Sequence, residues 1–316
     1  MKKIRIHSVW MLFLLSVFTC LQVKAQYMPV VFDKVYGDKN QIQLVCPLPG
    51  DEIAIVGKEG QKYNLTWIER EGNVVFSLSL MGFTVVNEIV ELDNNRVLVV
   101  GQSTMQYVKG KKGKITLCGR VVVIERNGRI VTDIYAGDQG SNFLKGMLLR
   151  SGSFVVSGSE PKGADGRQGI LLKLDPTGSV VYQYKNAGGG YCDQFAVMGN
   201  SIEYICAAFS AGKDKEQALV VRLDDKGKPY YMTTIPAKQF VVTGLNANIN
   251  DGSVLVIGNS PAEGGIIYKI RPEGDIVFAK NMIPANQGIA MLDHLQVARN
   301  GNILVGGSGS QGYYAL

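Results

Sequence analysis

Histidine is almost absent from this 316-residue chain, and its scarcity removes whole classes of catalytic site. The sequence contains two histidines, and the first of them, His7, lies in the N-terminal leader considered below. A His-rich zinc site is therefore excluded, and a Ser-His-Asp triad has only His294 available. A single histidine without an evident partner is most simply a structural residue, packed or partly solvated.

Motifs for cofactors and metals are missing as well. The glycine-rich segments AGGGY (187–191) and GGSGSQG (306–312) neither lead into a helix nor carry the lysine of a phosphate-binding loop. No calcium loop of the EF-hand type is recognisable. We therefore expect no cofactor and no metal, and the sequence names no catalytic residue.

Long apolar runs are confined to the N-terminus. A basic start is followed by VWMLFLLSVF (9–18), and Val23 and Ala25 then supply small residues before a cleavage site. This pattern is typical of a secretory signal peptide, and the run is too short to span a bilayer. The residues before Cys20 do not suit a lipoprotein signal. We expect residues 1–25 to be a signal peptide and residues 26–316 to be a single domain, exported to the periplasm or beyond, with no lipid anchor and no membrane span.

The net charge changes once the leader is set aside. The leader removes four of the 33 Lys and Arg residues and no acidic residue, which leaves 29 basic against 27 acidic residues. The isoelectric point near 8.9 therefore reflects the leader in part and gives no reason to expect a nucleic-acid partner.

Cysteine is sparse in the exported part. The four remaining cysteines show neither the spacing of a metal site nor that of a disulfide framework: Cys46, Cys118, Cys192 and Cys206. Export permits disulfides, so both states stay open, but buried thiols are the simpler expectation because free cysteine packs as a small apolar residue.

The chain repeats itself with a period of about 50 residues, the length of a four-stranded repeat unit. One anchor is an apolar strand that ends in glycine, as in DGSVLVIGNS; its aligned residues are Gly57, Gly101, Gly158, Ala208, Gly258 and Gly307, with alanine in the fourth unit. The second anchor is a turn between two strands, as in YKIRPEGDIVF; its glycines are Gly72, Gly128, Gly178, Gly227 and Gly274. Two independent anchors with one period predict a repeat architecture.

Each unit reads as four short strands bounded by turn residues, which is typical of a β-propeller blade. Pro229 falls in a fourth strand, which should therefore lie at a sheet edge. The sixth unit reaches only its third strand at GYYAL (312–316), and VVFDKVYG (30–37) resembles the fourth strands of the other units. We predict an all-β fold: a six-bladed β-propeller of four-stranded antiparallel blades, closed by the N-terminal strand, which completes the C-terminal blade. A truncated sixth blade is the alternative.

The pattern DGSVLVIGNS…GIIYKIRPEGDIVFAK resembles the secreted propeller repeats of Bacteroidetes-type bacteria. The resemblance covers residues 29–316 and implies a propeller and an exported protein, but no activity. The Trp-Asp pairs, Asp-boxes and Gly-Gly motifs of better-defined propellers are missing.

Candidate binding residues gather at one end of the predicted propeller, where the loops between second and third strands and between units emerge. The longest of these loops, 102–118, contains four lysines. The candidates are Tyr107, Lys111, Lys112, Asn142, Arg167, Tyr191 and Lys213. Such groups suit polar ligands, and they are equally ordinary in solvated loops.

The missing chemistry favours a non-enzymatic, monomeric binding or scaffold module for a protein or glycan partner in the cell envelope. The alternative is a carbohydrate-active enzyme or lectin that uses carboxylates, such as Asp138, at the loop-rich end. Scarce aromatic residues there count against sugar binding. Two carboxylates converging in a concave pocket would favour the enzyme, and an apolar patch would favour the binding module.

Overall fold

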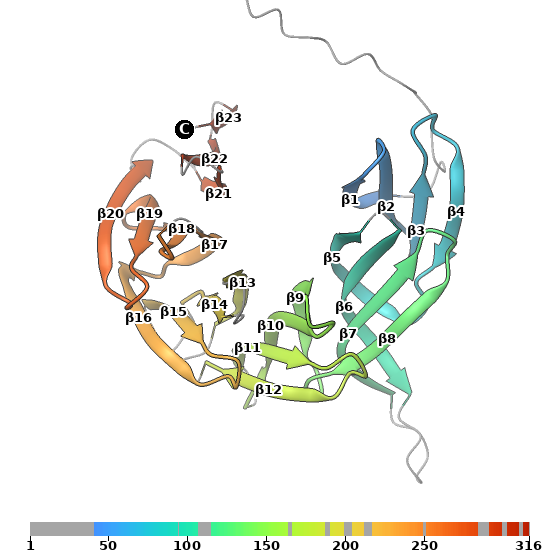
Figure 1. Cartoon of the computed structure of the whole chain (residues 1–316), viewed down its shortest axis with the longest axis horizontal. Helices are drawn as coiled ribbons and strands as arrows, with labels where there is room; N and C mark the ends of the chain where they lie inside the picture. Colours follow the sequence, from blue (N-terminus) through green and yellow to red (C-terminus); the bar gives the residue numbers. More distant parts are fainter. Residues whose placement is uncertain are drawn as a thin grey trace, which may run out of the picture. The chain divides into compact units, whose positions relative to one another are not determined.

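The computed structural model describes residues 41–93, 95–106, 115–163, 166–186, 190–198, 204–211, 217–248, 251–283, 291–298, 302–309 and 312–315. Every regular element in these ranges is a β-strand (Figure 1). Within them, no helix is long and apolar enough to cross a membrane. The predicted N-terminal strand, residues 30–37, lies outside the described residues.

The strands form six sheets, numbered here in chain order. Sheet 1 contains β1 (Gln41–Leu48), β2 (Glu52–Glu59), β3 (Lys62–Ile68) and β4 (Val74–Ser79). Sheet 2 contains β5 (Phe83–Asp93), β6 (Arg96–Gln106), β7 (Ile115–Glu125) and β8 (Ile130–Ala136). Sheet 3 contains β9 (Asn142–Leu148), β10 (Phe154–Lys162), β11 (Gly166–Leu174) and β12 (Val180–Lys185).

The second half of the chain continues the series. Sheet 4 contains β13 (Cys192–Met198), β14 (Tyr204–Phe209), β15 (Gln217–Leu223) and β16 (Pro229–Lys238). Sheet 5 contains β17 (Val241–Ala247), β18 (Val254–Ser260), β19 (Gly264–Ile270) and β20 (Ile276–Ile283). Sheet 6 contains three described strands, β21 (Met291–Val297), β22 (Ile303–Gly309) and β23 (Gly312–Ala315).

Within each sheet the strands lie in chain order, and neighbours are antiparallel. From sheet 3 onward, the first strand of a sheet packs against the first and second strands of the sheet before it, whereas β5 of sheet 2 packs against β1 and β3. Pro229 begins β16 at the edge of sheet 4, which confirms the predicted edge position. Several four-stranded antiparallel sheets in this order fit a β-propeller.

The turns between third and fourth strands are built alike and confirm the role predicted for their glycines. In sheet 4, the amide of Gly227 donates to the carbonyl of Asp224, and Gly227 has a φ of 79° that favours glycine. A Cβ at Gly227 would also lie 2.6 Å from the ring of Tyr182 in sheet 3. This glycine therefore serves both the turn and the packing between two sheets.

The glycine that ends most second strands allows two backbones to approach closely. In sheet 3, a Cβ on Gly158 would lie 2.0 Å from the carbonyl oxygen of Asn142, and in sheet 5 a Cβ on Gly258 would lie 2.3 Å from that of Val241. The first strand carries a β-bulge next to this position. The first anchor of the repeat is therefore a contact between the first and second strands.

The alignment of Ala208 with these glycines is wrong by one residue. In sheet 4 the bulge lies between Cys192 and Gln194, which pair with Phe209 and Ala208 respectively. In the other sheets the residue before the bulge pairs with the repeat glycine itself, so Phe209 occupies the glycine position.

A large and a small residue have exchanged strands in sheet 4. The ring of Phe143, on the first strand of sheet 3, covers Gly119 of sheet 2. The ring of Phe209, on the second strand of sheet 4, covers Gly169 of sheet 3 in the same way. Cys192 then takes the first-strand position that Phe143 holds in sheet 3. The space between neighbouring sheets is filled by one ring in both cases, which is why the repeat tolerates the exchange.

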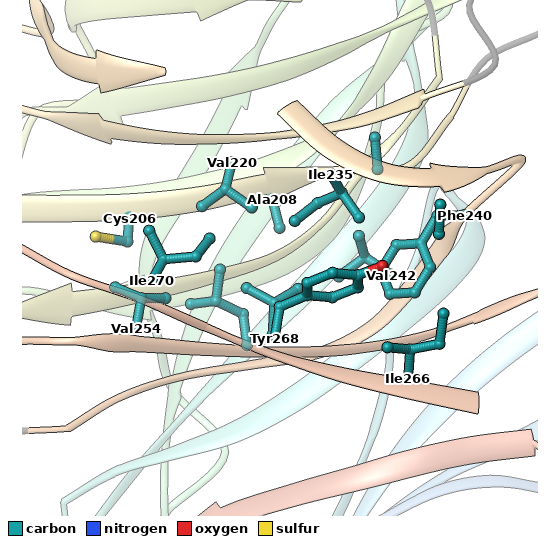
Figure 2. Close-up of a cluster of buried hydrophobic side chains, with 14 of the residues drawn as sticks. Cys206, Ala208, Val220, Ile235, Phe240, Val242, Val254, Ile266, Tyr268 and Ile270 are labelled. Atoms are coloured by element: carbon teal, nitrogen blue, oxygen red, sulfur yellow. The ribbon is translucent and has the colours of Figure 1, made fainter. Parts of the chain in front are cut away.

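Neighbouring sheets share apolar cores. Figure 2 shows the cluster formed by sheets 4 and 5, in which the rings of Phe240 and Tyr268 meet edge to face with centroids 5.5 Å apart. Cys206 belongs to this cluster, and the four cysteines among the described residues are buried and free, as expected from the sequence.

At three of the joints, the polar residue that follows the repeat glycine, or Phe209 in sheet 4, bonds to the next sheet. Gln102 donates to the carbonyls of Gly140 and Ser141, and the amide of Val242 donates to the hydroxyl oxygen of Ser210. Asn259 both donates to the carbonyl of Leu292 and accepts from its amide. The polar residue after the glycine is therefore part of the joint between sheets.

Candidate functional site

Four of the seven candidate binding residues lie outside the described part of the chain. These are Tyr107, Lys111, Lys112 and Lys213. Their role in binding stays a prediction.

Asn142 and Arg167 lie close together and bond within the protein. Arg167 donates to the hydroxyl and carbonyl oxygens of Ser159 and to the carbonyl of Gly140, at 2.8–3.1 Å. The Asn142 side chain accepts a hydrogen bond from Asn87, the bulge residue of β5, at 2.7 Å. Asn142 thus helps to join sheets 2 and 3, Arg167 fixes β10 and the connection between β8 and β9, and a ligand would have to share both side chains with these contacts.

Tyr191 and His294 stand apart from that network. Tyr191 precedes β13, its carbonyl accepts from the amide of Ser210, and its side chain is exposed. His294 lies on β21 and is also exposed.

Two carboxylates, those of Asp138 and Glu160, share one lysine as an ion-pair partner. Lys185 bridges Asp138 at 2.9 Å and Glu160 at 2.5 Å, and Gln168 also donates to Glu160. Burial lowers the pKa of Lys185, but its hydrogen bonds to the two carboxylates outweigh this and raise that pKa above its usual value. Glu160 is only 1% exposed, so this cluster cannot present two carboxylates to a substrate.

In the connection between sheets 1 and 2, residues 80–82, all three backbone carbonyls accept hydrogen bonds. The carbonyl of Leu80 accepts from the amide of Phe83, and that of Gly82 accepts from the amide of Thr104 at 2.8 Å. The carbonyl of Met81 accepts from the guanidinium of Arg120. The Met81 side chain is nonetheless 79% exposed, so a fixed backbone presents a flexible apolar side chain to solvent.

Arg120, which donates to the backbone carbonyl of Met81, is itself buried. It donates to both carboxylate oxygens of Asp133 at 2.8 Å and stacks between the rings of Phe83 and Tyr135, at 4.7 and 4.9 Å. Arg120 lies on the third strand of sheet 2, directly opposite the repeat glycine. In the other four-stranded sheets the residue opposite that glycine, or opposite Phe209 in sheet 4, is an asparagine or an aliphatic residue: Asn64, Ile170, Leu219 and Ile266. Because burying an arginine is costly without such partners, its presence at this position alone indicates a local requirement.

A cavity of about 320 Å³ opens beside Met81. We call it the Met81 pocket; it is lined by Gln61, Lys62, Tyr63, Ser79, Leu80, Met81, Gly82 and Phe83. None of these lining residues is a carboxylate, and Tyr63, Leu80 and Phe83 form buried apolar walls. The volume lies at the lower end of the range for ligand pockets.

Two lysines flank the Met81 pocket. Lys58 lies over the ring of Tyr63, 5.0 Å from its centroid, and Lys62 lines the cavity. Neither forms an ion pair with a carboxylate in the part of the chain that the structure describes. The surroundings of the pocket are therefore apolar within and basic at the edge.

The sequence did not single out the residues of the Met81 pocket. The pocket lies where β3 and β5 begin, which is the end that carries the predicted loops. A signal was present: Arg120 interrupts the apolar third strand CGRVVVI, where the other strands read GILLKL or GIIYKI.

Comparisons with known proteins support the fold alone. No protein-family model matches the sequence, and no curated protein matches it. A protein from Lactobacillus plantarum is similar in structure, with a TM-score of 0.57, 12% identity, and coverage of 90% of this chain and 82% of that chain. YCF48 from Cyanidioschyzon merolae gives a TM-score of 0.54 at 10% identity, with coverage of 88% and 80%. Drosophila Plexin A, solved in complex with Semaphorin 1b, gives 0.50 at 9%, with coverage of 88% and 73%. The propeller-like folds among these neighbours support a β-propeller here.

Proposed function

We propose that this protein is a non-enzymatic binding module that engages a protein partner through Met81 and the pocket beside it. The observation that carries the proposal is the combination of three hydrogen-bonded carbonyls at residues 80–82 with a Met81 side chain that is 79% exposed. A rigid backbone lowers the entropy that binding would otherwise cost, while methionine adapts its shape to a partner.

The pocket chemistry favours binding over catalysis. A glycosidase needs two accessible carboxylates at a defined separation. The Met81 pocket has none among its lining residues, and Asp138 and Glu160 are bridged by Lys185. Neither of these two sites supports the enzyme alternative.

Partner capture with matched methionine variants tests the proposal. Tagged protein (residues 26–316) would be incubated with a cell-envelope lysate, as wild type, Met81→Asp and Met232→Asp. Met232 is the control because it is also an exposed methionine, but on the outer strand β16. We expect a partner that is retained by the Met232→Asp variant and lost by the Met81→Asp variant. Equal capture by both variants would remove Met81 from the binding site and overturn the proposal.

We also propose that the fold is a closed ring of six blades, completed by residues 30–37 as the fourth strand of sheet 6. The supporting evidence is an unpacked position at each end of the series. Ile42 in sheet 1 is 60% exposed, whereas its counterparts are buried: Val86, Phe143, Cys192, Val242 and Leu292. Leu304 in sheet 6 is 46% exposed, whereas its counterparts are fully buried: Ala54, Leu98, Val155, Cys206 and Leu255.

The joint between sheets 2 and 3 supplies the template for closure. There Gly146 of the first strand lies against Leu98 of the preceding sheet. The equivalent pair between sheets 1 and 6 is Val45 and Leu304. Cysteines introduced at these two positions should therefore become cross-linked within one molecule by a short bifunctional thiol reagent.

A control pair places the second cysteine at Val277 on β20 and should not react. Deletion of residues 27–37 should reduce the Val45–Leu304 cross-link, because sheet 6 would lose its fourth strand. Cross-links that form only between molecules would show that a second copy covers these faces, contrary to the closed ring.

We further propose that the protein is exported as one of the secreted propeller repeat proteins of Bacteroidetes-type bacteria. The N-terminal pattern of residues 1–25 supports export, and the repeat pattern supports the kinship. Fractionation of expressing cells, followed by N-terminal sequencing, should find Gln26 as the first residue of the exported protein. A cytoplasmic protein that keeps residues 1–25 would contradict this.

A further inference from the structure

We propose that the Met81 pocket receives an apolar side chain from an acidic segment of the protein partner. This inference rests on the proposed binding function of Met81 and adds the chemistry of the partner.

The shape of the pocket calls for a small apolar group. Its inner walls are the buried side chains of Tyr63, Leu80 and Phe83, and its volume is about 320 Å³. Arg120 and Thr104 hold the carbonyls of the connecting loop, so the cavity exists before a ligand arrives. A preformed apolar cavity of this size suits one or two anchoring side chains of a partner.

The positive charge at the edge of the Met81 pocket determines which residues should flank the partner's apolar side chain. Lys58 and Lys62 flank the pocket, and neither is ion-paired with a carboxylate among the described residues. In the hairpin, Glu59 lies opposite Lys62 in the strand register, so this edge carries two lysines and one carboxylate. Carboxylates beside the anchor would complement this edge and speed association, while lysines there would be repelled.

A glycan fits the same surface less well. Sugars bind on open aromatic faces, yet Tyr63 and Phe83 are both buried. The ring of Tyr63 is also overlaid by Lys58. The large apolar side chain open to solvent at the pocket is Met81, which offers no hydrogen bond of ordinary strength to a hydroxyl group.

Three labelled peptides test the inference directly. Fluorescein-labelled Asp-Asp-Leu-Phe-Asp-Asp is the probe, Lys-Lys-Leu-Phe-Lys-Lys reverses its charge, and Asp-Asp-Ala-Ala-Asp-Asp removes its anchor. Binding to the exported chain would be followed by fluorescence anisotropy. We expect the acidic apolar peptide to bind at least about tenfold more tightly than either of the others, and its affinity to fall as salt rises.

Charge-reversal variants locate the effect on the protein. Lys58→Glu/Lys62→Glu should weaken binding of the acidic apolar peptide about tenfold or more. Lys226→Glu/Lys228→Glu makes the same charge change in the exposed turn between β15 and β16, at the end of the sheets opposite to that of the pocket. It should leave the affinity for the acidic apolar peptide within about twofold of wild type. Filling the cavity by Ser79→Trp should abolish the preference for Leu-Phe over Ala-Ala.

The outcomes separate this inference from the proposed function. Equal or tighter binding of the lysine peptide, equal effects of the two charge reversals, or no binding of any peptide would overturn the acidic-segment proposal. The function would still stand if Met81→Asp, and not Met232→Asp, lost the captured partner. It would fall if the two methionine variants behaved alike, whatever the peptides do.

Discussion

The exchange of a large and a small residue in sheet 4 leads to a sharp prediction about stability. Phe209 stands where most sheets have glycine, and Cys192 stands where sheet 3 has Phe143. Either arrangement places one ring over the third-strand glycine of the preceding sheet. Replacing both residues together, as Cys192→Phe/Phe209→Gly, should therefore restore the pattern of sheet 3 in sheet 4.

The single substitutions should each be destabilising for opposite reasons. Phe209→Gly empties a fully buried site and should cost about 4–6 kcal/mol, combining the loss of a buried ring with the added freedom of glycine in a strand. Cys192→Phe adds a second ring over Gly169 and should cost about 1–3 kcal/mol through overpacking. The double variant has one ring again, so it should lie within about 2 kcal/mol of wild type. The coupling free energy is then about 3 kcal/mol or more.

Urea unfolding followed by tryptophan fluorescence measures these differences from the transition midpoints at constant slope. Val242→Phe/Phe209→Gly serves as the control, because Val242 holds the equivalent first-strand position in sheet 5 and lies over a different neighbour. The control pair should be additive. Additive costs in the Cys192/Phe209 pair as well would refute the assignment of Phe209 to the glycine position.

Three further predictions concern ionisable groups. Arg120→Met should destabilise the fold by about 2 kcal/mol because it removes the charge-assisted hydrogen bonds of the buried guanidinium to Asp133, which is itself exposed. Arg120→Met/Asp133→Leu should be no less stable than Arg120→Met in urea unfolding but should still lose partner capture; recovery of capture in the double variant would show that Arg120 does not act through Met81. The hydrogen bonds from Arg126, and secondarily from Trp67, hold the pKa of Glu52 below its ordinary value of 4.5. The stabilisation from these bonds is therefore complete above pH 4.5 and is lost as the pH falls through the lower folded pKa. The urea midpoint of Glu52→Gln should approach that of wild type below about pH 4, and a constant difference between the two midpoints would count against this pair. Burial raises the pKa of Cys206 to about 11 and also raises the pKa values of Cys46 and Cys118. A chromogenic disulfide reagent at pH 8 should therefore react with these thiols only after urea is added, and rapid reaction with the native protein would contradict their burial.

The sequence was sufficient for the repeated unit because the unit is specified locally. Turn glycines such as Gly227 are required by backbone conformation, and an edge proline such as Pro229 is required by a missing donor. Both requirements can be read without knowing the neighbours. The position of Phe209 could not be read in this way, because what it satisfies is the volume between two sheets, and that volume can be filled from either strand.

The same distinction explains the candidate site. Asn142 and Arg167 were chosen because polar residues gather at the loop-rich end. In the structure Asn142 bonds to the neighbouring sheet, and Arg167 bonds to its own sheet and to the connection before it. Polar residues at that end, such as Gln102 and Asn259, join one sheet to the next, so polarity alone does not single out a ligand site. Met81 was overlooked because an exposed methionine in a short connection has no motif.

Departure from the repeat is therefore a better guide to function than composition. At the position opposite the repeat glycine, three sheets use an aliphatic residue that the core requires, and sheet 1 uses Asn64. Sheet 2 instead buries Arg120, which must be satisfied by Asp133, by two aromatic rings and by the Met81 carbonyl at once. Arg120 is buried but its partner Asp133 is exposed, and an ion pair with one solvated partner adds little net stability, so stability does not account for it. What Arg120 does that isoleucine cannot do is hold the backbone beneath an exposed Met81, and the binding surface is proposed at that residue for this reason.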